Sequence, residues 1–469
     1  MPSKTWRTAG LFLMILLLVA AGTIRGGNGG LSSDNIAQFQ DAFSMDRHTR
    51  AMYNAITNND IKSLALNRDI LQEHNEVFSH KIKARGITNQ KSSGRCWLFA
   101  GLNVMRPAVI EKYKLTGFEF SQNYLAFWDK MEKANCFLEH IIEFRDRDQL
   151  DREMVILLRS PFPDGGWWKY VVDLIEKYGV VPAEVMPETR SSGNTAMMNR
   201  LIGKKLRSDA VRLRSLHEKG QPEAALRTAK EQMLTEVYRM LVMNLGEPPA
   251  EFPYRFEDRD SVVSETKMYT PREFYSEFVG VDLTEYVSLF NDPTKELDRH
   301  YTIRLSRNIY DGRDIHFVNV DNSILKEVAS QSVIDDDPVW FACDVGKDQS
   351  REHGIMAMNI YDYDAIYKTD MGMTKAERVG YREESPNHAM VFVGVDIKEG
   401  HPVKWLVENS WGDQKGSKGY WTLYDDWFDN HVFNVIVKKK YVPAVIMAVY
   451  EQPPVVLPPW DPMFGMFRR

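Results

Sequence analysis

The stretch NQKSSGRCWLFAG, residues 89–101, contains Cys96, one of only three cysteines in a chain of 469 residues. Its apolar residues continue at helical spacing, so we expect a helix over residues 93–113. Ser92 or Ser93 is the expected side-chain cap. The sequence therefore predicts a cysteine in the first turn of a helix.

A cysteine at a helix start is suited to nucleophilic chemistry. The thiolate is the reactive form, and free cysteine titrates near pH ~8.5. The partial positive charge and unpaired N–H groups of a helix N-terminus favour the thiolate. Position alone does not distinguish a nucleophile from an inert core cysteine, so a basic partner is required.

The residues expected to assist Cys96 occur in two segments. His388 precedes the apolar run AMVFVGVDI, and Asn409 follows 21 residues later in ENSWG. The Asn409 side-chain oxygen can accept from the imidazole N–H and fix its tautomer, while Trp411 shields that bond from water. Gln90, with the backbone N–H of Cys96, can donate to an oxyanion. Taken singly, each residue also fits a structural role; taken together, they predict a cysteine nucleophile with a histidine base.

The chain order favours an α+β fold. Helical patterns come first, and short runs rich in valine and aromatic residues come last. The proline-rich tail, QPPVVLPPWDPMFGMFRR, is expected to run extended. A helix is expected over 120–142, and a turn over the start of 164–181 should enter a helix that stops near Gly179. Two helices, separated at Gly220 and Pro222, are expected over 195–245. The expected strands lie within 339–345, 388–397, 403–412, 419–428 and 432–441.

The N-terminus resembles a targeting segment. Lys4 and Arg7 precede an uncharged apolar run over residues 9–22, which is shorter than the ~20 residues that cross a bilayer. This pattern predicts a secretory signal with cleavage near Ala21, and hence a periplasmic or secreted protein. An uncleaved membrane anchor is the alternative.

Composition argues against several other classes. The net charge of −6 gives no indication of nucleic-acid binding, and no zinc-protease or phosphate-loop motif is present. We therefore expect no metal and no cofactor. Three cysteines allow at most one disulfide.

The fragments GRCW and NSWG, with a histidine between them, resemble the papain superfamily. The 292 residues between Cys96 and His388 exceed the ~130–150 of papain, which implies a helical insertion between the two papain-like lobes. ITNQKSSGRCWLFAGLNVMRP, DGGWWKYVVDLIEKYGVVP, MTKAERVGYRE and VVLPPWDPM are similar to the bleomycin hydrolase and bacterial aminopeptidase C family. The resemblance covers nearly everything from about residue 35 onward.

The N-terminal pattern and this resemblance together imply a domain division. It consists of a signal segment at 1–22, a helical lobe at 23–190, a mainly helical insertion at 191–310, a β lobe at 311–452 and a C-terminal arm at 453–469 that enters the cleft.

The resemblance also implies an activity, that of a cysteine aminopeptidase acting on peptides. Cys96 would be the nucleophile, His388 the base and acid, Asn409 the orienting residue, and Gln90 an oxyanion donor. Members of the family assemble as hexamers.

Substrate binding is implied for two glycines and the chain end. Gly165 and Gly166 would line the cleft, and the Arg469 carboxylate would meet the substrate amine, although this chain ends FGMFRR where relatives end in small apolar residues. An endopeptidase, if the tail leaves the cleft open, and a catalytically idle scaffold are the alternatives.

Overall fold

The computed structural model describes residues 29–84 and 86–467. The predicted signal segment and Arg469 lie outside these residues. The described chain forms two compact units that divide after Leu64. No helix within the described ranges is long and apolar enough to span a membrane.

The first unit consists of short helices. They are α1 (Ser33–Ala42), α2 (Arg47–Asn58) and the start of α3 (Ile61–Ala65). Ser32 caps α1 through a capping box with Asn35, and neither α1 nor α2 contains a buried residue.

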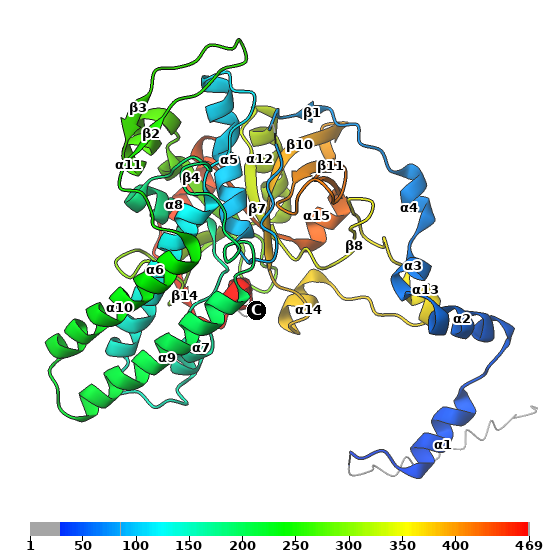
Figure 1. Ribbon diagram of the computed structural model, residues 1–469. Coiled ribbons are helices and arrows are strands. Elements are labelled where there is room, and N and C mark those ends of the chain that lie inside the picture. Colours follow the sequence, from blue (N-terminus) through cyan, green and yellow to red (C-terminus); the bar gives the residue numbers. More distant parts are fainter. Residues whose placement is uncertain (1–28, 85, 468–469) are drawn as a thin grey trace, which may run out of the picture. The chain divides into compact units, whose positions relative to one another are not determined.

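The second unit is built on one large sheet, with helices packed on it (Figure 1). Within the described residues its strand order is β14-β5-β6-β4-β13-β7-β10-β11-β12-β9-β8, with β1 paired to β10. The strands are β1 (His80–Lys81), β4 (Tyr286–Phe290), β5 (Arg299–Ile303), β6 (Ile315–Asn319), β7 (Val339–Cys343), β8 (Gln349–Ser350), β9 (Ile355–Met356), β10 (His388–Lys398), β11 (His401–Glu408), β12 (Tyr420–Tyr424), β13 (Val432–Lys438) and β14 (Val455–Leu457).

The predicted strands of the C-terminal half are confirmed as β7 and β10–β13. All of β7, the first eight residues of β10 and the first six of β13 are buried, because helices cover the sheet and apolar side chains occupy both faces. The α+β class follows from this largely antiparallel sheet with mostly separate helices.

The helix that carries Cys96 packs against this sheet. α5 packs on β7, β10 and α8, and most of its residues are buried. The helices of the second unit are α4 (Arg68–Glu73), α5 (Cys96–Lys112), α6 (Gln122–Glu143), α7 (Arg152–Arg159), α8 (Trp168–Tyr178), α9 (Ala196–Glu218), α10 (Glu223–Leu245), α11 (Pro271–Glu273), α12 (Asn322–Ile334), α13 (Tyr363–Tyr367), α14 (Lys375–Gly380), α15 (Asp425–His431) and α16 (Ala444–Tyr450).

The region predicted as a helical insertion has two halves. Its first half is the α9–α10 hairpin, which packs on α6 and is seen at the lower left of Figure 1. Its second half instead contains the β2 (Phe252–Tyr254) and β3 (Lys267–Tyr269) ribbon and then β4 and β5. Since β4 and β5 belong to the main sheet, the sheet begins before residue 310. The domain boundaries themselves stay predictions.

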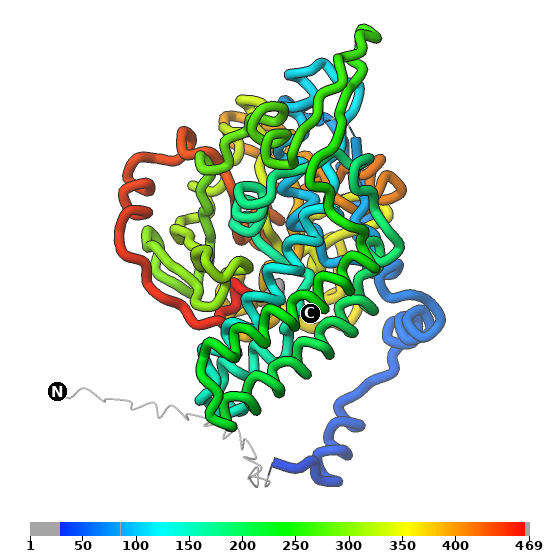
Figure 2. The backbone as a smooth tube through the Cα atoms, turned by 60° about the vertical axis from the view of Figure 1, so that its left-hand side comes forward, coloured from blue at the N-terminus to red at the C-terminus, as the bar shows by residue number. Residues whose placement is uncertain are grey.

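The tail follows the edge of the sheet. β14 pairs in parallel with β5, and Figure 2 shows this red segment beside the lime-coloured strands. The prediction of a wholly extended tail is wrong beyond Leu457, because residues 462–467 form 3-10 turns. Met463 is fully buried there, which fastens the tail to the unit.

Candidate active site

Cys96 is the first residue of α5, and its side chain is buried. The segment before it is fixed by its own side chains. Ser93 Oγ donates to the Gln90 carbonyl at 2.7 Å and accepts from Arg95 Nε at 3.0 Å, while Arg95 pairs with both carboxylate oxygens of Glu188. The predicted serine cap is therefore wrong: the N-cap position is Arg95, and no side chain caps the helix. The N–H groups of the first turn remain for the thiol and for a substrate oxygen.

His388 begins β10, directly opposite Cys343 on β7. Its Nε2 lies 2.9 Å from Asn409 Oδ1, which also accepts from the N–H of Ser410 at 2.8 Å. The Trp411 ring lies 4.8 Å from the imidazole, centroid to centroid. The structure thus brings His388, Asn409 and Trp411 together, and within residues 29–84 and 86–467 no hydrogen bond occupies the imidazole Nδ1.

The Cys96 thiol meets the start of β10. α5 packs on β10, and the N–H of Ala389, the residue after His388, faces the sulfur. Burial raises the pKa of Cys96 to about 11, against the opposing effect of the N–H groups of Ala389, Trp97 and Cys96 itself. Burial lowers the pKa of His388 to about 4, against the opposing effect of the Asn409 hydrogen bond. Either charge alone is disfavoured, so the ionised state available here is the pair, in which the proton moves from sulfur to imidazole.

Gln90 is held from two sides. Its backbone N–H donates to the Ser410 carbonyl at 2.9 Å, and its Oε1 accepts from Ser410 Oγ at 2.6 Å. One proton of its NH₂ group is directed to the Ser93 carbonyl at 2.5 Å. An amide NH₂ carries two protons, so the second can donate to an oxyanion near Cys96.

Gly165 and Gly166, the two glycines predicted to line the cleft, each make a close contact with a neighbouring residue. A Cβ on Gly166 would lie 2.4 Å from the Trp97 ring, so this backbone packs directly on the residue after Cys96. The Gly165 carbonyl accepts from Lys133 Nζ at 2.7 Å. The predicted substrate contact of Arg469 lies outside the described residues.

Asp164 is a positioning residue that the sequence analysis missed. Its carboxylate accepts from the N–H of Gly94 at 3.0 Å, from Asn199 Nδ2 at 2.6 Å and from the Thr195 hydroxyl, and it pairs with Lys130 Nζ at 2.7 Å. Burial raises the pKa of Asp164, but Lys130 and these hydrogen bonds outweigh it and hold the pKa well below its ordinary range. The carboxylate therefore joins the loop before Cys96 to the first turn of α9. The only sequence signal was the DGG motif itself.

A second missed feature is the buried pair of Arg106 on α5 and Glu408, the residue before Asn409. Arg106 Nη2 donates to both carboxylate oxygens of Glu408, at 2.7 and 2.8 Å. Burial raises the pKa of Glu408 to about 6, against the opposing effect of Arg106. The pair connects the helix of Cys96 to β11, which ends just before Asn409.

All three cysteines are free and buried. Cys136 Sγ lies 3.5 Å from His140 Nε2 on the same helix, and Cys343 lies in β7. The three cysteines therefore form no disulfide, which is within the predicted limit of at most one.

The comparisons with known proteins all point to the same protein family. The sequence profile of the Peptidase C1-like family matches residues 30–464. Aminopeptidase C of Listeria monocytogenes is 41% identical over 411 residues, covering 87% of this chain and 92% of that protein. Bleomycin hydrolase of Rattus norvegicus is 37% identical over 448 residues, covering 93% and 98%. The crystal structure of PepW from Lactobacillus rhamnosis HN001 matches this fold with a TM-score of 0.90 and 41% sequence identity. The match covers 93% of this chain and 99% of the PepW chain.

Proposed function

This chain belongs to the Peptidase C1-like family, and we propose that Cys96, His388 and Asn409 carry out its chemistry. It is a papain-like cysteine aminopeptidase, as identity of about 40% to aminopeptidase C over most of the chain supports. The observation that carries the residue assignment is that the N–H of Ala389, the residue after His388, faces the Cys96 sulfur, while His388 itself is hydrogen-bonded to Asn409.

The reaction follows from the free Nδ1 of His388. This nitrogen takes the Sγ proton as the sulfur attacks the substrate carbonyl carbon, and the carbonyl oxygen gains its charge facing Gln90 and the Cys96 N–H. The C–N bond breaks as His388 gives the proton to the departing amine. His388 then takes a proton from water, the resulting hydroxide attacks the thioester, and the thiol re-forms as the acid leaves.

Asn409 has an orienting role. Its Oδ1 accepts from the imidazole Nε2 and fixes the tautomer in which Nδ1 is the base. Trp411 and the buried surroundings exclude water from this bond, which strengthens it.

The test compares a fluorogenic aminoacyl substrate with its N-acetylated twin, using protein that begins after residue 22. We expect cleavage of the free-amine substrate alone, and none in Cys96→Ala. Cleavage of both would retain the cysteine mechanism and indicate an endopeptidase. Cleavage by Cys96→Ala would refute the assignment of the nucleophile, and cleavage of neither by the wild type would favour an idle scaffold.

We propose that the C-terminal arm selects free N-termini by lying in the cleft. Phe464 and Lys133 line a common cavity of about 520 Å³, and Lys133 Nζ donates to Gly165 of the predicted cleft wall. The described part of the tail is thus next to a residue that supports the cleft. A terminal carboxylate, that of Arg469, would then pair with the substrate ammonium.

We also propose a homohexamer, which rests on the family resemblance. Light scattering on the purified protein tests it. A mass of about six chains supports the hexamer, and a monomer refutes it.

We propose export, supported by Lys4, Arg7 and the apolar run at 9–22. Mass spectrometry of the protein from its native cells tests this. A new N-terminus near residue 22 in the extracytoplasmic fraction supports a cleaved signal. An intact chain in the membrane fraction would indicate an anchor, and an intact chain in the cytoplasm would refute export.

A further inference from the structure

We propose that Arg351 binds a carboxylate on the departing part of the substrate, so that peptides with an acidic group close behind the cleaved bond are preferred. This inference rests on the proposed function. Arg351 follows β8, in the turn before β9, and its side chain is exposed.

The chemistry fixes which side of the site Arg351 occupies. His388 must give its proton to the departing amine, so the departing segment leaves on the His388 side. Trp411 covers that side, with its ring centroid 4.8 Å from the imidazole. The Arg351 guanidinium carbon lies 4.9 Å from the Trp411 ring centroid. A segment that leaves over Trp411 therefore passes under Arg351.

The distances suit a short departing segment. The distance from the His388 ring centroid to that of Trp411, added to the distance from Trp411 to the Arg351 guanidinium carbon, gives a span of at most about 10 Å. Two extended residues reach ~7 Å, and a guanidinium hydrogen bond adds ~3 Å. The C-terminal carboxylate of a departing dipeptide, or an acidic side chain on its first residues, can reach the guanidinium.

The charge of Arg351 is available to a ligand. Within residues 29–84 and 86–467 its guanidinium has no ion pair and no hydrogen bond, whereas Arg95 and Arg106 each pair with a glutamate. Stacking on an indole face leaves the N–H edge of a guanidinium open for bidentate carboxylate binding. Arg351 also lowers the pKa of His388, after the larger effect of burial, which shows that its charge is felt at the site.

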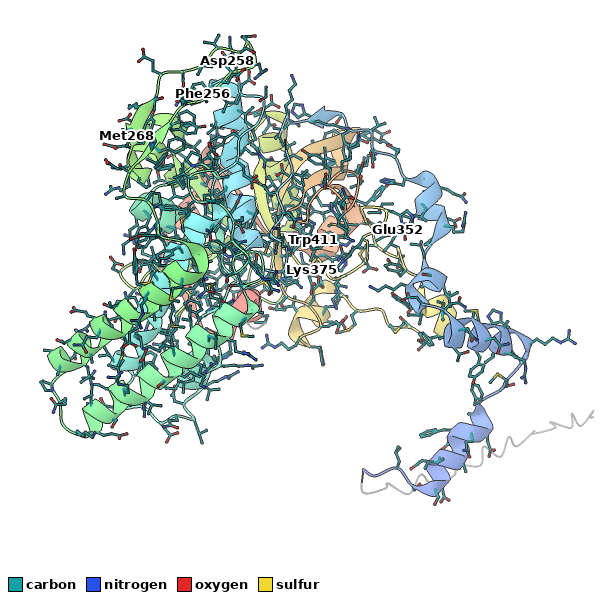
Figure 3. All side chains as sticks on the ribbon, viewed as in Figure 1. Phe256, Asp258, Met268, Glu352, Lys375 and Trp411 are labelled. Carbon is teal, nitrogen blue, oxygen red and sulfur yellow. The ribbon has the colours of Figure 1, made fainter. Side chains whose placement is uncertain are left out.

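The surrounding acids leave this position cationic. Asp348 is 3.3 Å from His431 Nε2, and Glu383 pairs with Lys347. Glu352 is the next residue; its side chain is exposed, and Figure 3 labels it to the right of Trp411. Glu352 is therefore the neighbouring acid in the chain with which a carboxylate of the substrate would compete.

The experiment measures kcat/KM for Ala-Ala-Ala and its C-terminal amide in wild type, Arg351→Gln and Arg351→Lys. A third peptide, Ala-Asp-Ala amide, separates a side-chain carboxylate from a terminal one. We expect wild type to prefer the acid over the amide roughly 3- to 10-fold, and salt to reduce that preference. In Arg351→Gln, kcat/KM for the acid should fall to that for the amide, because KM for the acid rises. Arg351→Lys should keep part of the preference for the acid.

Arg212→Gln is the matched control, since it removes the same charge from an exposed position on α9. It should keep the wild-type ratio. Equal rates on acid and amide in wild type, or an unchanged ratio in Arg351→Gln, would overturn the subsite while leaving the cysteine mechanism intact. Hydrolysis that survives Cys96→Ala would instead refute the proposed function and the subsite with it.

Discussion

At the scale of single residues, the site depends on a proton shared between two buried groups. Burial acts against a lone thiolate on Cys96 and against a lone imidazolium on His388. The helix start reduces the first penalty, and Asn409 reduces the second. The helix start alone is therefore not enough, because the sulfur also needs His388 to receive its proton.

Asp164 determines where the nucleophile loop lies. Asp164→Asn removes the charge opposite Lys130, whose side chain is 3% exposed, and alters the acceptor for Gly94. We expect unfolding free energy to fall by about 3–5 kcal/mol, and kcat to fall up to ~100-fold through displacement of Cys96. Urea unfolding and steady-state kinetics measure the two effects.

The matched control for Asp164→Asn is Asp209→Asn, which breaks a buried lysine pair on the same α9 helix. It should lower stability and leave kcat near wild type. An unchanged kcat in a folded Asp164→Asn protein would show that the loop keeps its position without this carboxylate.

At the scale of elements, the contact between α5 and the 164–167 loop leaves no room for a side chain. Gly166→Ala places a Cβ 2.4 Å from the Trp97 ring, so the indole or the loop must move. We expect a loss of about 1–3 kcal/mol in unfolding free energy, together with lower activity. Gly117→Ala, with open space around it, is the control and should change neither. Wild-type stability in Gly166→Ala would contradict this packing.

The Arg106–Glu408 pair makes stability depend on pH in a defined direction. The folded-state pKa of Glu408 is raised from its ordinary value of 4.5 to about 6, so the folded protein binds this proton more tightly than the unfolded chain does. Its contribution is present below pH ~4.5 and is lost as pH rises through about 6.

Glu408→Gln should abolish that fall, whatever constant cost the substitution has. The stability of the variant relative to wild type should then increase between pH 4.5 and pH 6–7, as measured by urea unfolding at several pH values. A relative stability that decreases over this range would mean that the ionised pair, not the protonated acid, is preferred in the fold.

The elements differ in how far the sequence predicts them. Local pattern predicts the long helices α9 and α10, because such helices bury one face at a regular spacing. It also predicts valine-rich strands such as β10, because they are buried on both faces. β4 and β5 are short, five residues each. They lie in the region predicted as mainly helical, because the long helical pattern before them dominated that prediction. The serine cap failed because Ser93 bonds Gln90 and Arg95 instead.

At the scale of the whole molecule, the site is assembled from distant parts of the chain. Cys96, His388 and Asn409 could be proposed from the sequence because each occurs in a recognisable local motif, and their catalytic roles stay predictions. Asp164 and Arg106 were not, since their partners are scattered over the chain and Arg106 is 302 residues from Glu408. Only the folded arrangement of helix, sheet and insertion shows these contacts.

The proposed role of the C-terminal tail in selecting free N-termini can be tested by truncation. Deleting residues 465–469 leaves β14 and the buried Met463 in place but removes the end of the proposed arm. We expect the truncated enzyme to gain cleavage of N-acetylated substrates. Full retention of free-amine selectivity would place the selecting group elsewhere.

The central claim, that His388 activates Cys96, is tested by iodoacetamide alkylation as a function of pH, with peptide mapping of the three cysteines. Wild type should be labelled at Cys96 near neutral pH. His388→Ala should lose this labelling and regain it only at strongly alkaline pH, because burial raises the pKa of the Cys96 thiol and no base then remains to take its proton. His140→Ala, which removes the imidazole beside Cys136, should behave like wild type. Equal Cys96 labelling with and without His388, or labelling confined to Cys136 or Cys343, would contradict the account.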